Sequence, residues 1–166
     1  TNSIYENANK CIDILESDSA SDSDKSFYLK LLVHFVGDLH QPLHIGRYED
    51  RGANRVYVKW FGRNSNLHRV WDSDMINSHN MSYSELAVNL PNPDFLVFTD
   101  EAKDFERADV LDWVNEIHSY TNQIYEGVSI DDKLGYKYQY ENFDTAKELL
   151  LIAGIRLAKI LNYLFD

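Results

Sequence analysis

LLVHFVGDLHQPLHIGRYEDRGANRVYVKWFGRNSNLHRVWD, residues 31–72, contains four of the six histidines of this 166-residue chain and places them among carboxylates. In its first part His34 and Asp38 are four residues apart, a spacing that puts two side chains on one face of an α-helix. The neighbouring residues are apolar, which predicts that this face is buried, and a buried carboxylate needs a partner. No Lys or Arg lies between Lys30 and Arg47, so a metal cation is the expected partner.

The second part of the stretch repeats the pattern. His68 and Asp72 are again four residues apart, in the segment NLHRVWDSDMI, whose apolar residues have helical spacing. Pro42 cannot continue the first helix, so we expect the chain to leave helical geometry near His40 and to carry His44 past the helix end. Two helices thus offer one His/Asp pair each, with a further histidine between them.

Imidazole nitrogens combined with carboxylate oxygens suit zinc better than calcium or magnesium. A single His-x3-Asp spacing is more often an ordinary surface pair on a helix, but two such pairs and His44 in one apolar context favour a metal site. His40 falls about 120° from His34 on a helical wheel. We interpret it as a core histidine or as one that orients a metal ligand through a hydrogen bond.

These segments resemble a known family. HFVGDLHQPLH, DRGAN, WFG and NLHRVWD are similar to the signature of the single-strand-specific zinc nucleases of moulds, plants and bacteria (S-one/P-one type), which share a fold with bacterial zinc-dependent phospholipase C. DWVNE and AGIRLAKILNYLF fit the last helices of the family, so the resemblance covers nearly the whole chain. It implies a mainly α-helical domain.

The resemblance also implies three zinc ions in one cleft. His34 corresponds to a ligand of one ion of a close pair, and Asp38 to the carboxylate that bridges this pair, so these two are the expected catalytic residues. His44, His68 and Asp72 correspond to the complete protein ligand set of the third ion. Such a three-ligand site leaves positions open for water or phosphate, as catalytic zinc sites do.

The chain departs from the family pattern in two places. Family members begin with a zinc-binding Trp and carry a His, an Asp and another His before the segment that opens this chain at Thr1. We therefore expect residues 1–166 to be one domain, the C-terminal two-thirds of such an enzyme, with the other ligands on a missing N-terminal segment or a second chain. This chain alone should hold at least one zinc. Ala53 replaces a Gly that relatives usually have before Asn54, which makes the backbone there less free.

The implied activity is hydrolysis of phosphodiesters in single-stranded RNA and DNA, and also of 3′-phosphomonoesters, by water that zinc activates. A preference for single strands requires an aromatic side chain on which an unstacked base can lie. Tyr48, Tyr57 and Phe61 are near the histidines in sequence, although core packing is the commoner role of such residues. Asn54 and Asp74 are candidates for hydrogen bonds to ligands or substrate.

Two alternatives remain open. The first is a phospholipase C-like phosphodiesterase on the same scaffold, although the phospholipases typically place Glu at the position of Asp72. The second is an inert or metal-binding helical fragment without turnover. A di-iron helical bundle is disfavoured because the chain contains no Glu-x-x-His pair.

Charge and composition limit the class of partner. The formal net charge of −11 argues against a protein that holds duplex DNA by a broad basic surface, but divalent ions can make a positive cleft in an acidic protein. Cys11 is the only cysteine in the chain, so an internal disulfide is excluded. No apolar run reaches the length of a membrane span, and a secreted or periplasmic location is implied by the resemblance alone.

The periodicity of apolar residues predicts the remaining elements. Long helices are expected at residues 4–15, 25–40, 110–125 and 145–165. A capping box at residues 82–85 predicts the start of a further short helix. Apolar and polar residues alternate near residues 55–61, which predicts a short strand or one arm of a β-hairpin.

Overall fold

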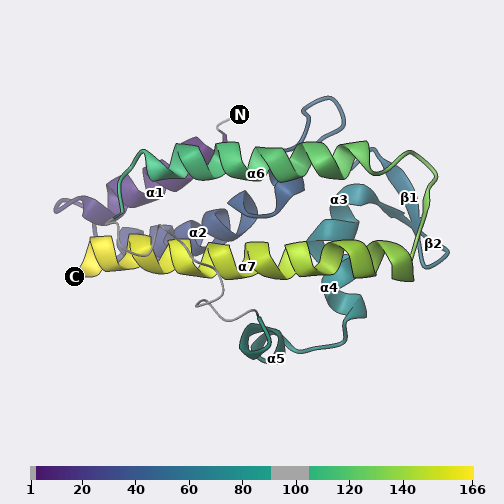
Figure 1. Ribbon diagram of the computed structural model, residues 1–166. Coiled ribbons are helices and arrows are strands. Elements are labelled where there is room, and N and C mark those ends of the chain that lie inside the picture. The colour runs from purple at the N-terminus through teal and green to yellow at the C-terminus, as the bar shows by residue number, and fades with distance from the viewer. Residues whose placement is uncertain (1–2, 91–104) are drawn as a thin grey trace.

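The computed structural model describes residues 3–90 and 105–166. In chain order the elements are α1 (Ile4–Glu16), α2 (Asp22–Leu39), the 3₁₀-helix η1 (Pro42–Ile45), β1 (Tyr57–Trp60), β2 (Arg63–Asn66), α3 (Leu67–Arg69), the π-helix η2 (Val70–Asp74), α4 (Met75–Ser78), α5 (Tyr83–Val88), α6 (Asp109–Glu126), β3 (Lys133–Leu134) and α7 (Tyr136–Phe165). The long helices α6 and α7 run along one side of the molecule, and α1 and α2 pack against them (Figure 1). The predicted mainly α-helical class is confirmed.

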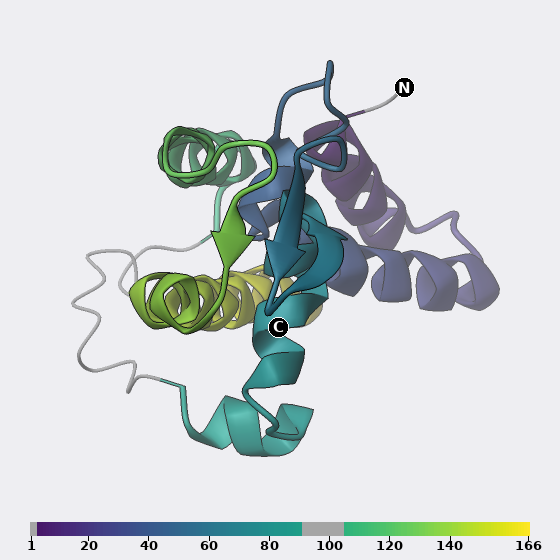
Figure 2. The same ribbon diagram turned by 90° about the vertical axis from the view of Figure 1, so that its right-hand side faces the viewer.

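A small sheet closes the end of the molecule opposite α1 (Figure 2). Strands β1 and β2 form the hairpin expected near residues 55–61, with Tyr57 opposite Asn66. Phe61 and Gly62 in its turn both have positive φ, which gives the twist of a type I′ turn. The third strand, β3, pairs parallel to β1 and was not predicted, because two residues are too few to show an alternating pattern.

Two helices begin earlier than their apolar periodicity predicts. Helix α2 starts at Asp22, because the Ser21 hydroxyl accepts the backbone N–H of Asp24 and caps the helix there. Helix α7 starts at Tyr136 rather than at residue 145. Its first two turns are mostly polar and exposed, so they continue the helix without an apolar stripe that could reveal it.

The core consists of two clusters of buried side chains. One lies among α1, α2, α6 and α7 and includes Val36 and Leu39. The other lies around the hairpin, η2 and the facing parts of α6 and α7, and it includes Leu43. The segment that joins α2 to η1 therefore runs from one cluster to the other and is fixed at both ends. Within residues 3–90 and 105–166, no helix has the length and hydropathy needed to cross a bilayer.

Candidate metal centre

His44, His68 and Asp72 converge at the junction of η1, α3 and η2. Each offers one ligand atom, and the three atoms all lie within 4.8 Å of one another. Pro42 is the first residue of η1 and redirects the chain after α2. The Asn66 side chain accepts the Arg69 N–H and starts the helical segment that carries the other two residues. The structure thus brings together the three residues that the family resemblance grouped.

The spacing of these atoms suits zinc. At a Zn–N distance of about 2.0–2.1 Å, two neighbouring ligands of a tetrahedral ion lie about 3.3–3.4 Å apart. His44 Nε2 and Asp72 Oδ1 are separated by 3.3 Å. The three ligand atoms all lie within 4.8 Å of one another. The residues therefore fit a zinc ion in donor type, and the His44–Asp72 separation fits it in distance.

The tautomer of His68 also fits a ligand. Its Nδ1–H donates to the Gly52 carbonyl oxygen at 2.7 Å, which leaves the lone pair of Nε2 free for a metal. Gly52 has a φ of 63°, and a Cβ atom built on it would stand 2.2 Å from the Leu43 carbonyl oxygen. Only glycine can therefore present its carbonyl to His68 at this place.

Asp72 lies within a π-turn. Instead of a continuous α-helix, the chain forms the wider π-helix η2 immediately after α3. Single π-helical turns of this kind occur frequently at functional sites. The buried indole of Trp71 donates its Nε1–H to the Tyr138 hydroxyl at 2.9 Å and fixes this turn against α7. Apolar spacing could not distinguish this turn from an ordinary helical one.

The predicted pair His34 and Asp38 lies next to the group of His44, His68 and Asp72. Asp38 Oδ2 is 3.1 Å from His34 Nε2 and 3.5 Å from His44 Nδ1. His44 therefore stands between two carboxylates, those of Asp38 and Asp72, one facing each of its ring nitrogens. The four side chains form one continuous polar cluster.

The predicted burial of the His34/Asp38 face is wrong. The His34 side chain is 61% exposed and the Asp38 side chain 25%. The buried residues of this part of α2, Leu32, Val36 and Leu39, lie on the opposite side of the helix. The case for a cation at Asp38 therefore depends on its nearness to the two histidines and not on burial.

His40 occupies the core. Its Nδ1–H donates to the Val36 carbonyl at 2.7 Å, and its Nε2 accepts from Arg156 at 3.1 Å. Burial lowers the pKa of His40 to about 4, so the ring is neutral at pH 7. Arg156 is itself buried, pairs with Glu116 and stacks on Trp113. This network joins α6 and α7 to the end of α2.

Four further candidates, Asn54, Asp74, Tyr57 and Phe61, make their contacts elsewhere. Asn54 donates to the Arg51 carbonyl at 2.9 Å and shapes its own loop. Asp74 accepts from Ser65 at 2.6 Å and ties η2 to the hairpin. Tyr57 is exposed on β1. Phe61 lies in the hairpin turn against Tyr136, with ring centroids 4.7 Å apart.

Sequence reasoning missed Tyr125 and Asp50, which hold the loop between η1 and β1. The Tyr125 hydroxyl donates to Asp50 Oδ1 at 2.7 Å and accepts the Arg47 N–H at 3.2 Å. The same Asp50 oxygen accepts the Ala53 N–H at 2.7 Å. Burial, followed by the bond to Asp50, raises the pKa of Tyr125 to about 12. We call these contacts the Tyr125 clasp.

The clasp supports a strained piece of backbone. Arg51, Gly52 and Ala53 all have φ between 58° and 63°, and a non-glycine residue in this left-handed region costs roughly 1–2 kcal/mol. Ala53 is also fully buried. The carbonyl that orients His68 belongs to the middle residue of this strained run, so the clasp and the metal cluster share one loop.

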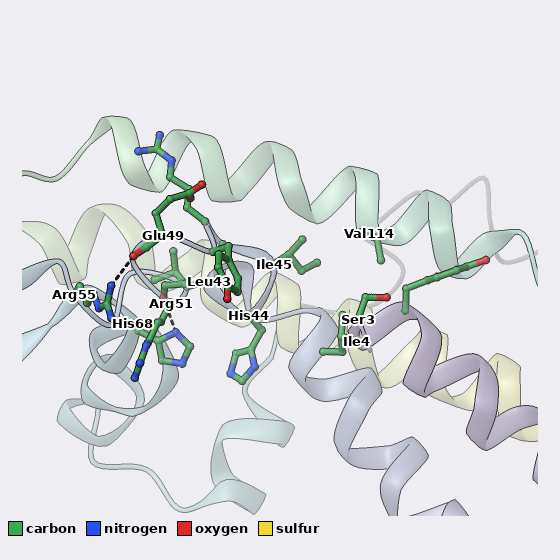
Figure 3. A pocket seen from close by; sticks show the side chains of 15 residues that line it. Ser3, Ile4, Leu43, His44, Ile45, Glu49, Arg51, Arg55, His68 and Val114 are labelled. Carbon is green, nitrogen blue, oxygen red and sulfur yellow. Dashed lines mark hydrogen bonds between the residues drawn. The ribbon is translucent and has the colours of Figure 1, made fainter. Parts of the chain in front are cut away.

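An open pocket of about 940 Å³ lies beside the cluster. His44 and His68 line it together with side chains of the clasped loop (Figure 3). Three of these loop residues are arginines and one is a glutamate: Arg47, Arg51, Arg55 and Glu49. The pocket gives a solute access to the metal cluster from the loop side.

Comparison with known proteins identifies relatives of this architecture. A family model described as S1/P1 Nuclease matches residues 1–166. Endonuclease 3 of Arabidopsis thaliana is 33% identical over 162 residues, which cover 83% of this chain and 51% of that protein. Endonuclease 2 of the same plant is 30% identical over 148 residues, with coverages of 82% and 51%. Nuclease S1 of Aspergillus oryzae is 28% identical over 167 residues, with coverages of 87% and 56%. The chain spans about half the length of these relatives.

Proposed function

The chain belongs to the S1/P1 nuclease family, and on this premise we propose that the protein containing it hydrolyses phosphodiester bonds of single-stranded RNA and DNA with zinc as cofactor. We extend the proposal to 3′-phosphomonoesters. The observation that carries it is the convergence of His44, His68 and Asp72, with His68 held in the tautomer that a metal requires.

Each residue of the cluster has a definite part in this proposal. Zinc held by His44, His68 and Asp72 would neutralise charge on a phosphate and on the departing oxygen, and zinc held at Asp38 would lower the pKa of the attacking water. His68 keeps its Nε2 directed away from Gly52 through the bond at Nδ1. Asp38 and His34 provide the adjoining part of the centre, where we propose that they hold a close pair of ions, with Asp38 as the shared ligand.

The remaining ligands of that pair are proposed to lie outside residues 1–166, on another segment of the same protein. Asp38 and His34 offer only two side chains, and His34 is largely exposed, so this part of the centre has room for further donors. We also propose that the protein works outside the cytoplasm, in a secreted or periplasmic form.

Zinc counting on the longer protein tests the assignment. Asp38→Ala should lose two of three zinc ions, because it would remove the shared ligand of the close pair, whereas His68→Ala should lose one. His118→Ala is the matched control, since His118 is exposed on α6 and bonds only Asn122 among the described residues. Retention of three zinc ions in Asp38→Ala would contradict the proposal.

The two alternatives have their own signatures. A phospholipase C-like enzyme would hydrolyse phosphatidylcholine and leave poly(A) intact. An inert fragment would hold about one zinc and turn over neither substrate. Assaying both substrates with the same zinc-loaded preparation separates the three cases.

A further inference from the structure

The outer face of the small sheet exposes aromatic side chains at the end of the molecule that Figure 2 shows. Burial alternates along β1, where Val58 and Trp60 are buried and Tyr57 is 60% exposed. Because successive side chains of a strand point to opposite faces, Tyr57 and Lys59 lie on the face that is turned away from the core. This face of the sheet has no covering element among the described residues.

The aromatic surface continues from the hairpin onto α7. Phe61, in the hairpin turn, packs against Tyr136 at the start of α7, with ring centroids 4.7 Å apart. Tyr140 follows four residues later on the same face of the helix, and both tyrosines are more than four-fifths exposed. Exposed Ile130 borders the surface, because the N–H of the next residue donates to the Tyr57 carbonyl at 2.8 Å. We call Tyr57, Phe61, Tyr136 and Tyr140 the aromatic patch.

Phe61 occupies a backbone position that disfavours a bulky side chain. Its φ is 47°, and that of Gly62 is 79°, so the hairpin turn is of a type in which Asn before Gly is the preferred pair. A phenylalanine in the left-handed region is strained, and this one remains 40% exposed. Turn formation therefore does not explain the ring, and strain at an exposed position points to a function of the side chain.

Basic side chains lie among the rings of the patch. Residues 57–66 and 130–141 contain four Lys or Arg and three Asp or Glu, in a chain with a formal net charge of −11. Lys133 is opposite Lys59 in the pairing of β3 with β1, and Lys137 lies between the two tyrosines of α7 in sequence. The excess of negative charge is thus carried by the rest of the chain, so an anionic surface attracts this end of the molecule.

An open pocket of about 390 Å³ lies in this basic surface. Its lining includes two lysines and two carboxylates: Lys133, Lys137, Asp132 and Glu141. Asp132 Oδ2 accepts the Ser129 N–H at 2.7 Å, and Glu141 lies 3.7 Å from Lys137. The Lys133 side chain forms no hydrogen bond or ion pair with a described residue. It therefore offers a free ammonium group to a phosphate that enters the pocket.

We propose that the aromatic patch and its lysines bind the surface of a phospholipid bilayer that contains anionic lipids. Tyrosine suits the boundary between lipid and water, because its ring is apolar and its hydroxyl stays hydrated. Lysine can lay its apolar stem along the lipid and keep its charge at the phosphates. The binding is peripheral, since no helix within residues 3–90 and 105–166 could cross a bilayer. The inference goes beyond the proposed nuclease function and does not depend on it.

The arrangement favours a bilayer over a nucleic acid strand. The Phe61 and Tyr136 rings meet at an interplanar angle of 79°, so the edge of one ring covers the face of the other, and Ile130 has no ring at all. These side chains form a continuous apolar surface rather than a series of free faces on which bases could stack. An apolar centre with lysines among it matches the boundary region of an anionic bilayer.

Vesicle cosedimentation of the zinc-loaded longer protein tests the proposal. We would compare vesicles of phosphatidylcholine alone with vesicles of equal parts phosphatidylcholine and phosphatidylglycerol, and expect tighter binding to the mixed vesicles. A triple variant, Phe61→Asn with Tyr136→Gln and Tyr140→Gln, should bind the mixed vesicles at least about tenfold more weakly, because it removes apolar area from the contact. Lys133→Gln should weaken this binding roughly fivefold, and the effect should disappear at high salt.

The controls separate lipid binding from a general loss of structure. Tyr83→Gln and Lys30→Gln are matched variants, because both side chains are exposed outside the patch, and they should bind like the unmutated protein. Phe61→Asn should not impair folding, since Asn before Gly suits the turn, and the urea midpoint and zinc content of each variant check this. Mixed vesicles should slow amide exchange in residues 57–61 and 133–140 of the unmutated protein but not of the triple variant.

Any of three results would overturn the proposal. The first is failure of the unmutated protein to bind the mixed vesicles, whether or not it forms a dimer through this face. The second is equal binding by the triple variant and the control variants. The third is weaker oligo-dT binding by the triple variant with vesicle binding unchanged, which would make the surface a nucleic acid site. Failure of the proposed nuclease function looks different, since absence of poly(A) hydrolysis would leave all vesicle results as they are.

Discussion

Replacing Tyr125 by Phe isolates the contribution of the clasp to the metal centre. The change keeps the ring on which Arg47 stacks and removes only the hydroxyl that bonds Asp50 and the Arg47 amide. A hydrogen bond to a charged group contributes about 1.5–3 kcal/mol. Because Tyr125 is partly exposed, we expect the lower end, a loss of about 1.5–2 kcal/mol in the free energy of unfolding.

The same change should weaken zinc binding. The carbonyl that orients His68 belongs to Gly52, which lies between two non-glycine residues with left-handed backbone. Without the clasp this strained run relaxes more easily, and the Gly52 carbonyl then holds the His68 ring less firmly in place. Loss of such outer support typically lowers metal affinity 10–100-fold. We expect about tenfold, because the Asp50 bond to the Ala53 amide remains.

Two measurements separate stability from metal binding. Urea unfolding in the presence of a chelator gives the free energy of the metal-free protein, and competition with a chromophoric chelator gives the zinc affinity. Nitrogen chemical shifts of the His68 ring should also show a smaller fraction of the Nδ1–H tautomer in Tyr125→Phe. Tyr120→Phe is the control, because Tyr120 lies on the same helix and its hydroxyl has no hydrogen bond among the described residues.

A fall in stability with zinc affinity unchanged within twofold would refute the reasoning. The clasp would then support the loop as a structural element and have no influence on His68. Equal effects of Tyr125→Phe and Tyr120→Phe would refute it as well, since both would then reflect a general response of α6.

Three further changes have expected outcomes. Gly52→Ala should cost at least about 2 kcal/mol of stability, because its Cβ would stand 2.2 Å from the Leu43 carbonyl oxygen at a left-handed φ. It should also lower the zinc affinity measured by chelator competition. Arg156→Ala should lower the free energy of unfolding by roughly 3 kcal/mol in urea titrations, because it leaves His40 and Glu116 without their shared partner; a loss below 1 kcal/mol would show that the network is not a stabilising one. Burial raises the pKa of Tyr138 to about 12, so its contribution to stability is complete below pH 10 and is lost as pH rises toward 12. Compared with Tyr138→Phe, the unmutated protein should lose roughly 2–3 kcal/mol of its free energy of unfolding between about pH 10 and pH 12. Parallel pH–stability curves for the two proteins would contradict the buried placement of the phenol.

The helices and the two His/Asp pairs were predictable from sequence, because their signals lie within a few residues of one another. Two His-x3-Asp spacings and Pro42 predicted two helical His/Asp pairs with His44 between them, because periodicity and a helix stop act within a few residues. The grouping of His44, His68 and Asp72 on one ion came from the family resemblance. The position of one His/Asp pair relative to the other in space was not encoded locally. It depends on the hairpin and the clasped loop, which bring η1 and α3 side by side.

The side-chain contacts of the site that sequence reasoning missed lie between distant segments of the chain. Tyr125 meets Asp50 across 75 positions, and Trp71 meets Tyr138 across 67, so neither pair leaves a mark on local periodicity. The burial of the His34 face was mispredicted for a different reason. The apolar residues Leu32, Val36 and Leu39 are neighbours of His34 in sequence, but helical spacing puts them on the opposite face of α2.

One loop serves two separable roles, and this is why the effects of substitutions can be assigned. Its backbone, fixed by Tyr125 and Asp50, presents the Gly52 carbonyl to His68, whereas its side chains Tyr48 and Arg51 face the pocket. Changes at the clasp should therefore disturb zinc binding first and substrate binding through it. Changes at the pocket side chains should leave zinc affinity intact. A substitution at Tyr48 or Arg51 that lowered zinc affinity would show that the two roles are not separable, and the loop would then have to be treated as part of the metal centre itself.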